Sequence, residues 1–282
     1  MRGKNVTIWV TILVLCLGSQ RAVGWIQFND GRTYNIDYEI RDEVWVDYEA
    51  PKMATTVNWL EGGSIASTTR RLGTEVLPAG YKLKAFEDSR INVSGGSTWD
   101  LYSHDRSQVT ISSGSVETLY AFDSSQVTVS GGQTDGPLYA YDNSEVAISG
   151  GKIGYTLHAY DSSRVTWSGG SIGDSWYTVF DGEWYAQTED NIYIDDEAIL
   201  TIEGLGFSVD GTAVAYGDIT SILRGSIEDE PLRHLAGRLA SGQPIHNDFY
   251  IGHDAKIVLV PEPATVFLLG LGGLALLRRR KR

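Results

Sequence analysis

Residues 119–132 read LYAFDSSQVTVSGG, a pattern that occurs five times in the chain. In its second half, Val127 and Val129 alternate with polar residues, as in a strand with one buried face. Residues 123–125 (Asp-Ser-Ser) and 131–132 (Gly-Gly) are typical turn residues, because Asp and Ser bond to nearby backbone groups and glycine accepts a positive φ. The pattern therefore predicts two short strands, each bounded by tight turns.

In the other four copies the position of Phe122 is taken by Phe86, His104, Tyr141 and Tyr160, so neighbouring copies lie about 18–19 residues apart. One such unit cannot bury its apolar face alone, but stacked units can, each adding a rung of ~4.8 Å. We therefore expect an all-β fold: a parallel β-helix (β-solenoid) of ~18–19-residue rungs. An antiparallel sandwich is the alternative, and the near-constant step weighs against it.

Stacking would turn the repeated apolar residues into buried rows of like side chains, which suits β-branched residues in parallel strands. The three expected rows are Leu101, Leu119, Leu138 and Leu157; Val109, Val127, Val146 and Val165; and Ile111, Val129, Ile148 and Trp167.

Weaker patterns flank the repeats, which we place at residues 81–190. Residues 25–80 are expected to form an N-terminal β segment or cap, with a trace of the repeat at 56–65. Residues 191–259 are expected to form a β-rich C-terminal cap, because a solenoid has to cover its open ends.

Composition excludes several functional classes. The formal net charge is −13, and nearly all the acidic residues lie between 25 and 260, which argues against a nucleic-acid partner. The only cysteine is Cys16, inside an N-terminal apolar run. We therefore expect no disulfide, thiol nucleophile or Cys-ligated metal in the mature protein.

The N-terminus has the pattern of a secretory signal peptide. Arg2 and Lys4 precede an apolar run at 6–17, which is shorter than a bilayer span. Small residues follow at 22–24, so a signal peptidase is expected to remove residues 1–24 by cutting between Gly24 and Trp25. An uncleaved anchor is the alternative.

The C-terminus carries three parts in order: the motif Val260-Pro261-Glu262-Pro263, an apolar segment at 264–277, and five basic residues at 278–282. The apolar segment is expected to form a short hydrophobic helix, a transmembrane helix of about 21 Å against a ~30 Å bilayer core. The basic end would stay in the cytoplasm. An ordinary tail anchor is the alternative.

These residues resemble the PEP-CTERM sorting tail of exported bacterial proteins, over 260–282 only. The resemblance implies an exosortase-like processing enzyme as a partner and processing near residues 261–263. It also implies a chain anchored in the inner membrane in transit and then delivered to the cell surface or extracellular matrix. The delivered protein would then have the envelope or its exopolysaccharide matrix as a partner.

Three repeated surface rows are candidate binding sites. The row Asp105, Asp123, Asp142 and Asp161 could bind Ca²⁺, the only cofactor considered, or could cap a turn in every rung. Two rows of aromatic rings could stack on sugars or on one another. The first row is at 86, 104, 122, 141 and 160, with Phe180 as a further member, and the second is at 102, 120, 139 and 158. Thr110, Thr128 and Thr166 form a broken column that resembles, in part, an ice-binding face.

A catalytic site is not predicted. Acidic residues at 190 and 195–197 are candidates for glycoside cleavage, but such residues are abundant in this chain. The five histidines lack metal-ligand spacing, so no metal residue is assigned either. We expect a non-enzymatic surface or matrix protein, a scaffold or adhesin, with a carbohydrate-binding or carbohydrate-degrading β-helix as the alternative and an ice-binding surface as a minor one.

Overall fold

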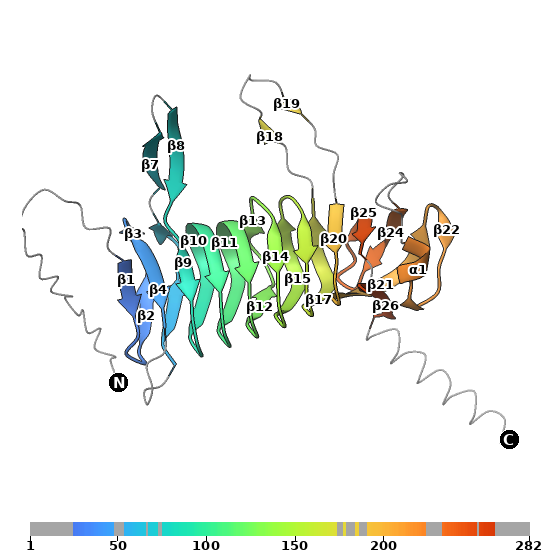
Figure 1. Cartoon of the computed structure of the whole chain (residues 1–282), viewed down its shortest axis with the longest axis horizontal. Coiled ribbons are helices and arrows are strands. Elements are labelled where there is room, and N and C mark those ends of the chain that lie inside the picture. Colours follow the sequence, from blue (N-terminus) through green and yellow to red (C-terminus); the bar gives the residue numbers. More distant parts are fainter. Residues whose placement is uncertain are drawn as a thin grey trace, which may run out of the picture.

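The structure is a computed structural model, and it describes residues 25–47, 54–65, 67–72, 75–173, 177–178, 184–185, 191–223, 233–252 and 254–262. Nearly all the described elements are strands, wound one rung after another along a long axis (Figure 1). Residues 24, 180, 190 and 253, and everything after 262, lie outside the described part.

The first rungs are built from short strands that pair in parallel. They are β1 (Trp25–Phe28), β2 (Thr33–Ile36), β3 (Glu39–Ile40), β4 (Glu43–Val46), β5 (Thr56–Trp59), β6 (Ser64–Ile65) and β9 (Leu83–Ala85). Strand β1 pairs with β4, β2 with β5, β3 with β6, and β4 with β9.

The repeats form the regular middle of the molecule. Its strands are β10 (Arg90–Ser103), β11 (Gln108–Ala121), β12 (Gln126–Val129), β13 (Gln133–Thr134), β14 (Leu138–Ala140), β15 (Glu145–Ile153), β16 (Leu157–Ala159) and β17 (Arg164–Ile172). Arg90 pairs with Gln108, Gln108 with Gln126, Gln126 with Glu145, and Glu145 with Arg164, all in parallel. The repeat step seen in the sequence is therefore the register of the sheet.

The predicted Leu, Val and Ile rows are confirmed by this register. Leu101, Leu119, Leu138 and Leu157 are successive partners, as are the members of the other two rows. All twelve side chains are at most 2% exposed and belong to one core cluster that runs the length of the body. Glycine is required where the rungs turn: Gly132 has a φ of 72°, and a Cβ there would lie 2.8 Å from the carbonyl oxygen of Gly114.

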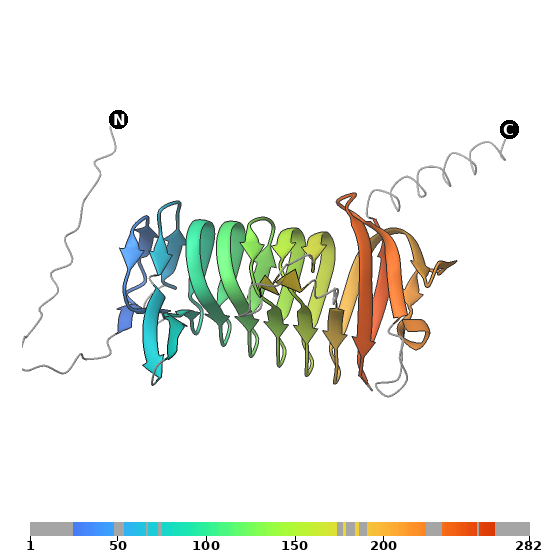
Figure 2. The ribbon, with the colours of Figure 1, turned by 90° about the horizontal axis from the view of Figure 1, so that it is seen from above.

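The C-terminal part mixes parallel and antiparallel pairing. Its elements are β20 (Asn191–Ile194), β21 (Ile199–Val209), β22 (Thr212–Ala213), β23 (Gly217–Asp218), α1 (Thr220–Leu223), β24 (Arg233–Leu239), β25 (Pro244–Ile251) and β26 (Lys256–Pro261). Strands β20, β21, β25 and β26 continue the parallel pairing, whereas β22, β23 and β24 pair antiparallel (Figure 2).

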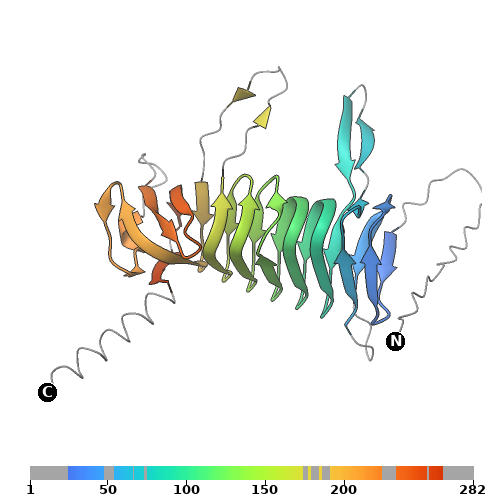
Figure 3. The same cartoon turned by 180° about the vertical axis from the view of Figure 1, so that it is seen from behind.

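Two small antiparallel sheets interrupt the winding. They are formed by β7 (Ser67–Leu72) with β8 (Glu75–Gly80) and by β18 (Tyr177–Thr178) with β19 (Trp184–Tyr185). Both project from the same side of the body (Figures 1 and 3).

The predicted fold class has to be corrected. The chain is all-β, but it is not a uniform parallel β-helix of ~18–19-residue rungs. Twenty-two of the described strands join into one mixed sheet, in which four pairings are antiparallel, and the two small sheets β7–β8 and β18–β19 are antiparallel as well. Facing residues are 18 or 19 positions apart in the repeats and between β1 and β4, but not throughout the chain. Asn35 and Asn58 are 23 apart, Asn58 and Asn92 are 34 apart, and Asp161 and Asp196 are 35 apart. The physical reason is that inserted hairpins lengthen the winding at both ends and the C-terminal strands fold back on one another.

Candidate functional site

The repeated acidic residues form a ladder of turns, which we call the Asp ladder. It consists of Glu87, Asp105, Asp123, Asp142, Asp161 and Asp196, whose φ angles all lie between 53° and 58°. Asp adopts this left-handed conformation more readily than most residues, which explains why five of these six positions are Asp.

The five aspartates of the Asp ladder each accept a hydrogen bond from the preceding rung. The backbone N–H of Asp105 donates to Oδ2 of Asp123 over 3.0 Å, and the N–H of Asp123 donates to Oδ2 of Asp142 over 3.1 Å. The same bond recurs at Glu87, Asp142 and Asp161. Across the described ranges, no group of three or more acidic or histidine side chains is arranged to hold a metal ion. The hydrogen bonds show that the aspartates cap a turn in successive rungs.

The repeated aromatic residues form two neighbouring columns on the surface, which we call the ring strip. One column is Phe86, His104, Phe122, Tyr141 and Tyr160; the other is Tyr102, Tyr120, Tyr139, His158, Tyr193 and Tyr250. Ring centroids of neighbouring rungs are 4.5 Å apart for Tyr102 and Tyr120 and 4.9 Å apart for His104 and Phe122, with planes 9° and 7° apart. This spacing follows from the rise between strands.

Stacking of this kind covers the ring faces. Each inner ring lies between the rings of the rungs before and after it, so only ring edges and hydroxyl groups reach the partly exposed surface. Sugars bind aromatic side chains mainly by apolar contact with a free ring face. The ring strip therefore supports stacking between rungs rather than a carbohydrate-stacking surface. Phe180, a predicted member, lies outside the described residues.

A polar cluster at one corner of the strip was not predicted from the sequence. The Lys82 ammonium donates to the Tyr102 hydroxyl over 3.1 Å, and that hydroxyl donates to Oδ2 of Asp100 over 3.4 Å. Burial raises the pKa of Asp100, and it raises the pKa of Tyr102 to about 12. Burial, reinforced by the charges of Asp135 and Asp100, also raises the pKa of Glu117. The residues come from different rungs, so only the register of the strands reveals that they meet.

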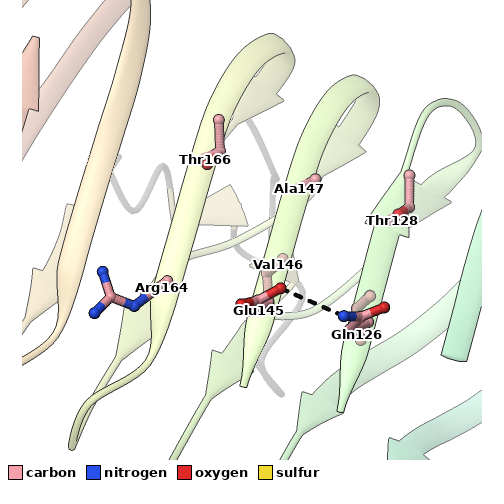
Figure 4. Close-up of a pocket in the computed structure, with 8 residues that line it drawn as sticks. Gln126, Thr128, Glu145, Val146, Ala147, Arg164 and Thr166 are labelled. Atoms are coloured by element: carbon pink, nitrogen blue, oxygen red, sulfur yellow. Dashed lines mark hydrogen bonds between the residues drawn. The ribbon is translucent and has the colours of Figure 1, made fainter. Parts of the chain in front are cut away.

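The threonine column lies on another face. Thr110, Thr128, Ala147 and Thr166 are partners in register, and Ala147 leaves a shallow depression between Thr128 and Thr166 (Figure 4). The column begins at Asn92, whose amide donates to Asn58 over 2.9 Å. The column is thus single and interrupted, as the sequence indicated, and it offers no continuous threonine array.

The candidate catalytic carboxylates that the structure describes make local hydrogen bonds. Asp196 belongs to the Asp ladder, Asp195 accepts a bond from the N–H of Asp196, and Glu197 accepts a bond from Ser162. Asp190 lies outside the described residues. Of the histidines, His104 and His158 belong to the ring strip, and His234 contacts Asp248 at 2.9 Å and stacks on His246.

The predicted processing sites lie at the two ends of the described body. Trp25 is the first residue of β1 and stacks on Trp45 at 5.0 Å. Val260 and Pro261 belong to β26, where they pair with Glu203 and Gly204, and Glu262 follows directly. Gly24, Pro263 and the apolar segment 264–277 lie outside the described residues. Within the described ranges, no helix has the length and apolarity needed to cross a membrane.

Comparison with known proteins adds one finding. Residues 259–282 match the PEP-CTERM protein-sorting motif. No curated protein and no solved structure matches the chain. The match is confined to the C-terminal end, where the sequence carries the Pro-Glu-Pro motif, the apolar segment and the basic residues in that order. The chain therefore carries a PEP-CTERM sorting motif, which marks it as an exported protein that an exosortase sorts toward the envelope or cell surface.

Proposed function

We propose that the protein is a non-enzymatic scaffold of the cell surface or extracellular matrix. The observation that carries the proposal is the sorting motif at residues 259–282, which follows an extended β body. On this proposal a signal peptidase removes residues 1–24, and the tail holds the chain in the inner membrane. Exosortase processing near residues 261–263 then releases the body into the envelope or its exopolysaccharide matrix.

The repeated residues make contacts between neighbouring rungs, which supports a scaffold role. Carboxylates of the Asp ladder accept backbone N–H groups of the neighbouring rung, and the rings of the strip cover one another's faces. Such rows stabilise a long, stiff stack, because each rung contacts only its neighbours and contributes similar contacts. The most regular features of the surface are thereby committed to holding rungs together.

The test is the fate of the chain in cells with and without an active exosortase. With the enzyme, the body is expected in the envelope or medium, without residues 278–282. In cells that lack the enzyme, the same chain is expected in the inner membrane at full tail length. A body that reaches the surface equally in both cells would contradict the proposal.

The polar cluster of Lys82, Asp100, Tyr102 and Glu117 favours a second candidate, saccharide binding. Half-buried carboxylates with raised pKa values beside hydroxyl and ammonium groups are typical of binding sites for polar ligands, and hydroxyl-rich sugars match their hydrogen-bonding groups. A glycan array on the body tests it. Asp100→Asn should abolish any binding, whereas Thr128→Ala, on another face, should leave the binding unchanged.

A further inference from the structure

The sorting motif begins inside the folded body. Its first three residues, Leu259, Val260 and Pro261, are the end of β26 and pair in parallel with Ile202, Glu203 and Gly204 of β21. On the other side of β26, Leu259 pairs antiparallel with Gly217 of β23. The motif therefore starts in a strand that has neighbours on both edges.

Burial fixes this strand in place. Leu259 is 1% exposed, and Val260, Pro261 and Glu262 are partly buried. The hydroxyl of Tyr216 also donates to the carbonyl oxygen of Gly204, the partner of Pro261, over 3.2 Å. The strand end is thus held by main-chain pairing and by the core, and Tyr216 in turn bonds to its partner strand β21.

The chain offers almost no spacer between this strand and the apolar segment. Only Glu262 and Pro263 separate Pro261 from the apolar run that starts at residue 264. Two extended residues reach about 7 Å. An enzyme that takes the motif as an extended chain needs free residues on both sides of the bond it cuts, and paired strands supply these only by local opening.

We propose that the end of β26 gates the sorting reaction. The gate rests on the proposed exosortase processing and adds its regulation: the enzyme binds the motif only after residues 259–261 have detached from β21 and Leu259 has detached from β23. The rate of release then depends on how often the last strand opens, while the rest of the stack stays folded.

A reversible lock across the two strands tests the gate. Glu203 and Val260 are register partners, so their Cα atoms lie at the ~4.8 Å strand spacing that a disulfide accepts. Both side chains are partly exposed. The only natural cysteine is Cys16, in the predicted signal peptide, so Glu203→Cys with Val260→Cys forms one defined disulfide. The matched control is Thr128→Cys with Ala147→Cys, exposed register partners in the middle of the stack.

The readout is the rate at which full-length chain is converted to tail-less body in cells with an active exosortase, followed by intact mass after a pulse of synthesis. The Glu203/Val260 disulfide should slow conversion at least tenfold relative to each single variant, and a thiol reductant should restore it. The Thr128/Ala147 disulfide should leave the rate unchanged, with or without reductant.

A second variant works in the opposite direction and needs no disulfide. Four residues, Gly-Ser-Gly-Ser, inserted between Leu259 and Val260 move the motif away from the sheet and should speed conversion. The same insertion after Gly211, an exposed turn residue of the β21–β22 hairpin, should not. Equal conversion of locked and single variants would overturn the gate, and so would equal conversion of the two insertions. If no variant is converted, with or without reductant, the proposed exosortase processing itself fails.

Discussion

Asp123 provides a quantitative test of the Asp ladder. Its φ is 58°, its Oδ2 accepts the N–H of Asp105 over 3.0 Å, and its side chain is 52% exposed. Alanine in this left-handed conformation costs about 1–2 kcal/mol. The lost hydrogen bond to a charged group would cost about 1.5–3 kcal/mol if buried, and we discount it to about 1 kcal/mol because half of the side chain is in water. Asp123→Ala should therefore lower the free energy of unfolding by about 2–3 kcal/mol.

Two further substitutions separate the backbone and hydrogen-bond contributions. Asp123→Gly keeps the positive φ without strain and loses the bond, so it should cost about 1 kcal/mol, with a small addition from the entropy of glycine. Asp123→Asn keeps both the conformation and an acceptor oxygen and should cost less than about 1 kcal/mol. Urea unfolding of the body, residues 25–262, gives the three values at constant m.

The decisive result is the order of the losses in unfolding free energy: largest for Asp123→Ala, smaller for Asp123→Gly and smallest for Asp123→Asn. Equal losses for Asp123→Ala and Asp123→Asn would refute the reasoning, because they would show that neither the left-handed turn nor the acceptor oxygen matters. A calcium role makes a different prediction: a chelator would then destabilise the natural protein and leave Asp123→Ala unaffected. On the present account a chelator changes none of the four unfolding curves.

The remaining predictions concern the core, a histidine and a buried hydroxyl. Val127→Ala removes two buried carbons from a side chain that is 1% exposed and should cost about 2–3 kcal/mol, whereas Thr128→Ala on the exposed face should stay within about 0.5 kcal/mol, as urea midpoints would show. Burial lowers the pKa of His158 to about 4, so the folded state binds fewer protons than the unfolded state. Stability is therefore lost as the pH falls from about 6.5 to about 4. His158→Tyr should flatten this part of the stability–pH curve. Ser144 is fully buried and its hydroxyl has no hydrogen-bond partner among the described residues, so Ser144→Ala should leave the melting temperature unchanged or raise it, whereas a fall of several degrees would show that the hydroxyl is bonded.

The regular middle of the fold could be predicted because one pattern determines it. A residue such as Val127 has the same neighbours in each rung, so the spacing of the copies is also the spacing of the partners. The alternation of apolar and polar residues then decides which side chains are buried. The ladder role of Asp123 was predictable for the same reason.

The ends of the fold could not be predicted in this way. The hairpins β7–β8 and β18–β19 are inserted between rungs, so the distance between partners such as Asn58 and Asn92 no longer reports the repeat. Beyond β21, strands β22, β23 and β24 pair antiparallel with their neighbours, and this pairing depends on turns and packing rather than on a repeated pattern. The predicted fold class therefore missed the hairpins inserted between the rungs and the mixed, partly antiparallel sheet that the C-terminal strands join.

The candidate sites, too, could be predicted only where a repeated or continuous pattern in the sequence marks them. The rows of rings and acidic residues were found by their repetition, but the orientation that covers the ring faces follows from the rung spacing in three dimensions. The cluster of Lys82, Asp100, Tyr102 and Glu117 has no repeated pattern at all and depends on residues of adjacent rungs meeting at one corner. The sorting motif is continuous in sequence and could therefore be recognised directly.

The central claim, that the chain is exported and sorted through its tail, is tested most directly by the intact mass of the protein released at the cell surface. In a host with an active exosortase, the account predicts a body that starts at Trp25 and ends near residues 261–263. Replacing Pro261 and Pro263 by alanine should leave membrane insertion intact but keep full-length tails in the inner membrane, because the apolar segment is unchanged. Surface-released protein that still contains Arg282 would contradict the account.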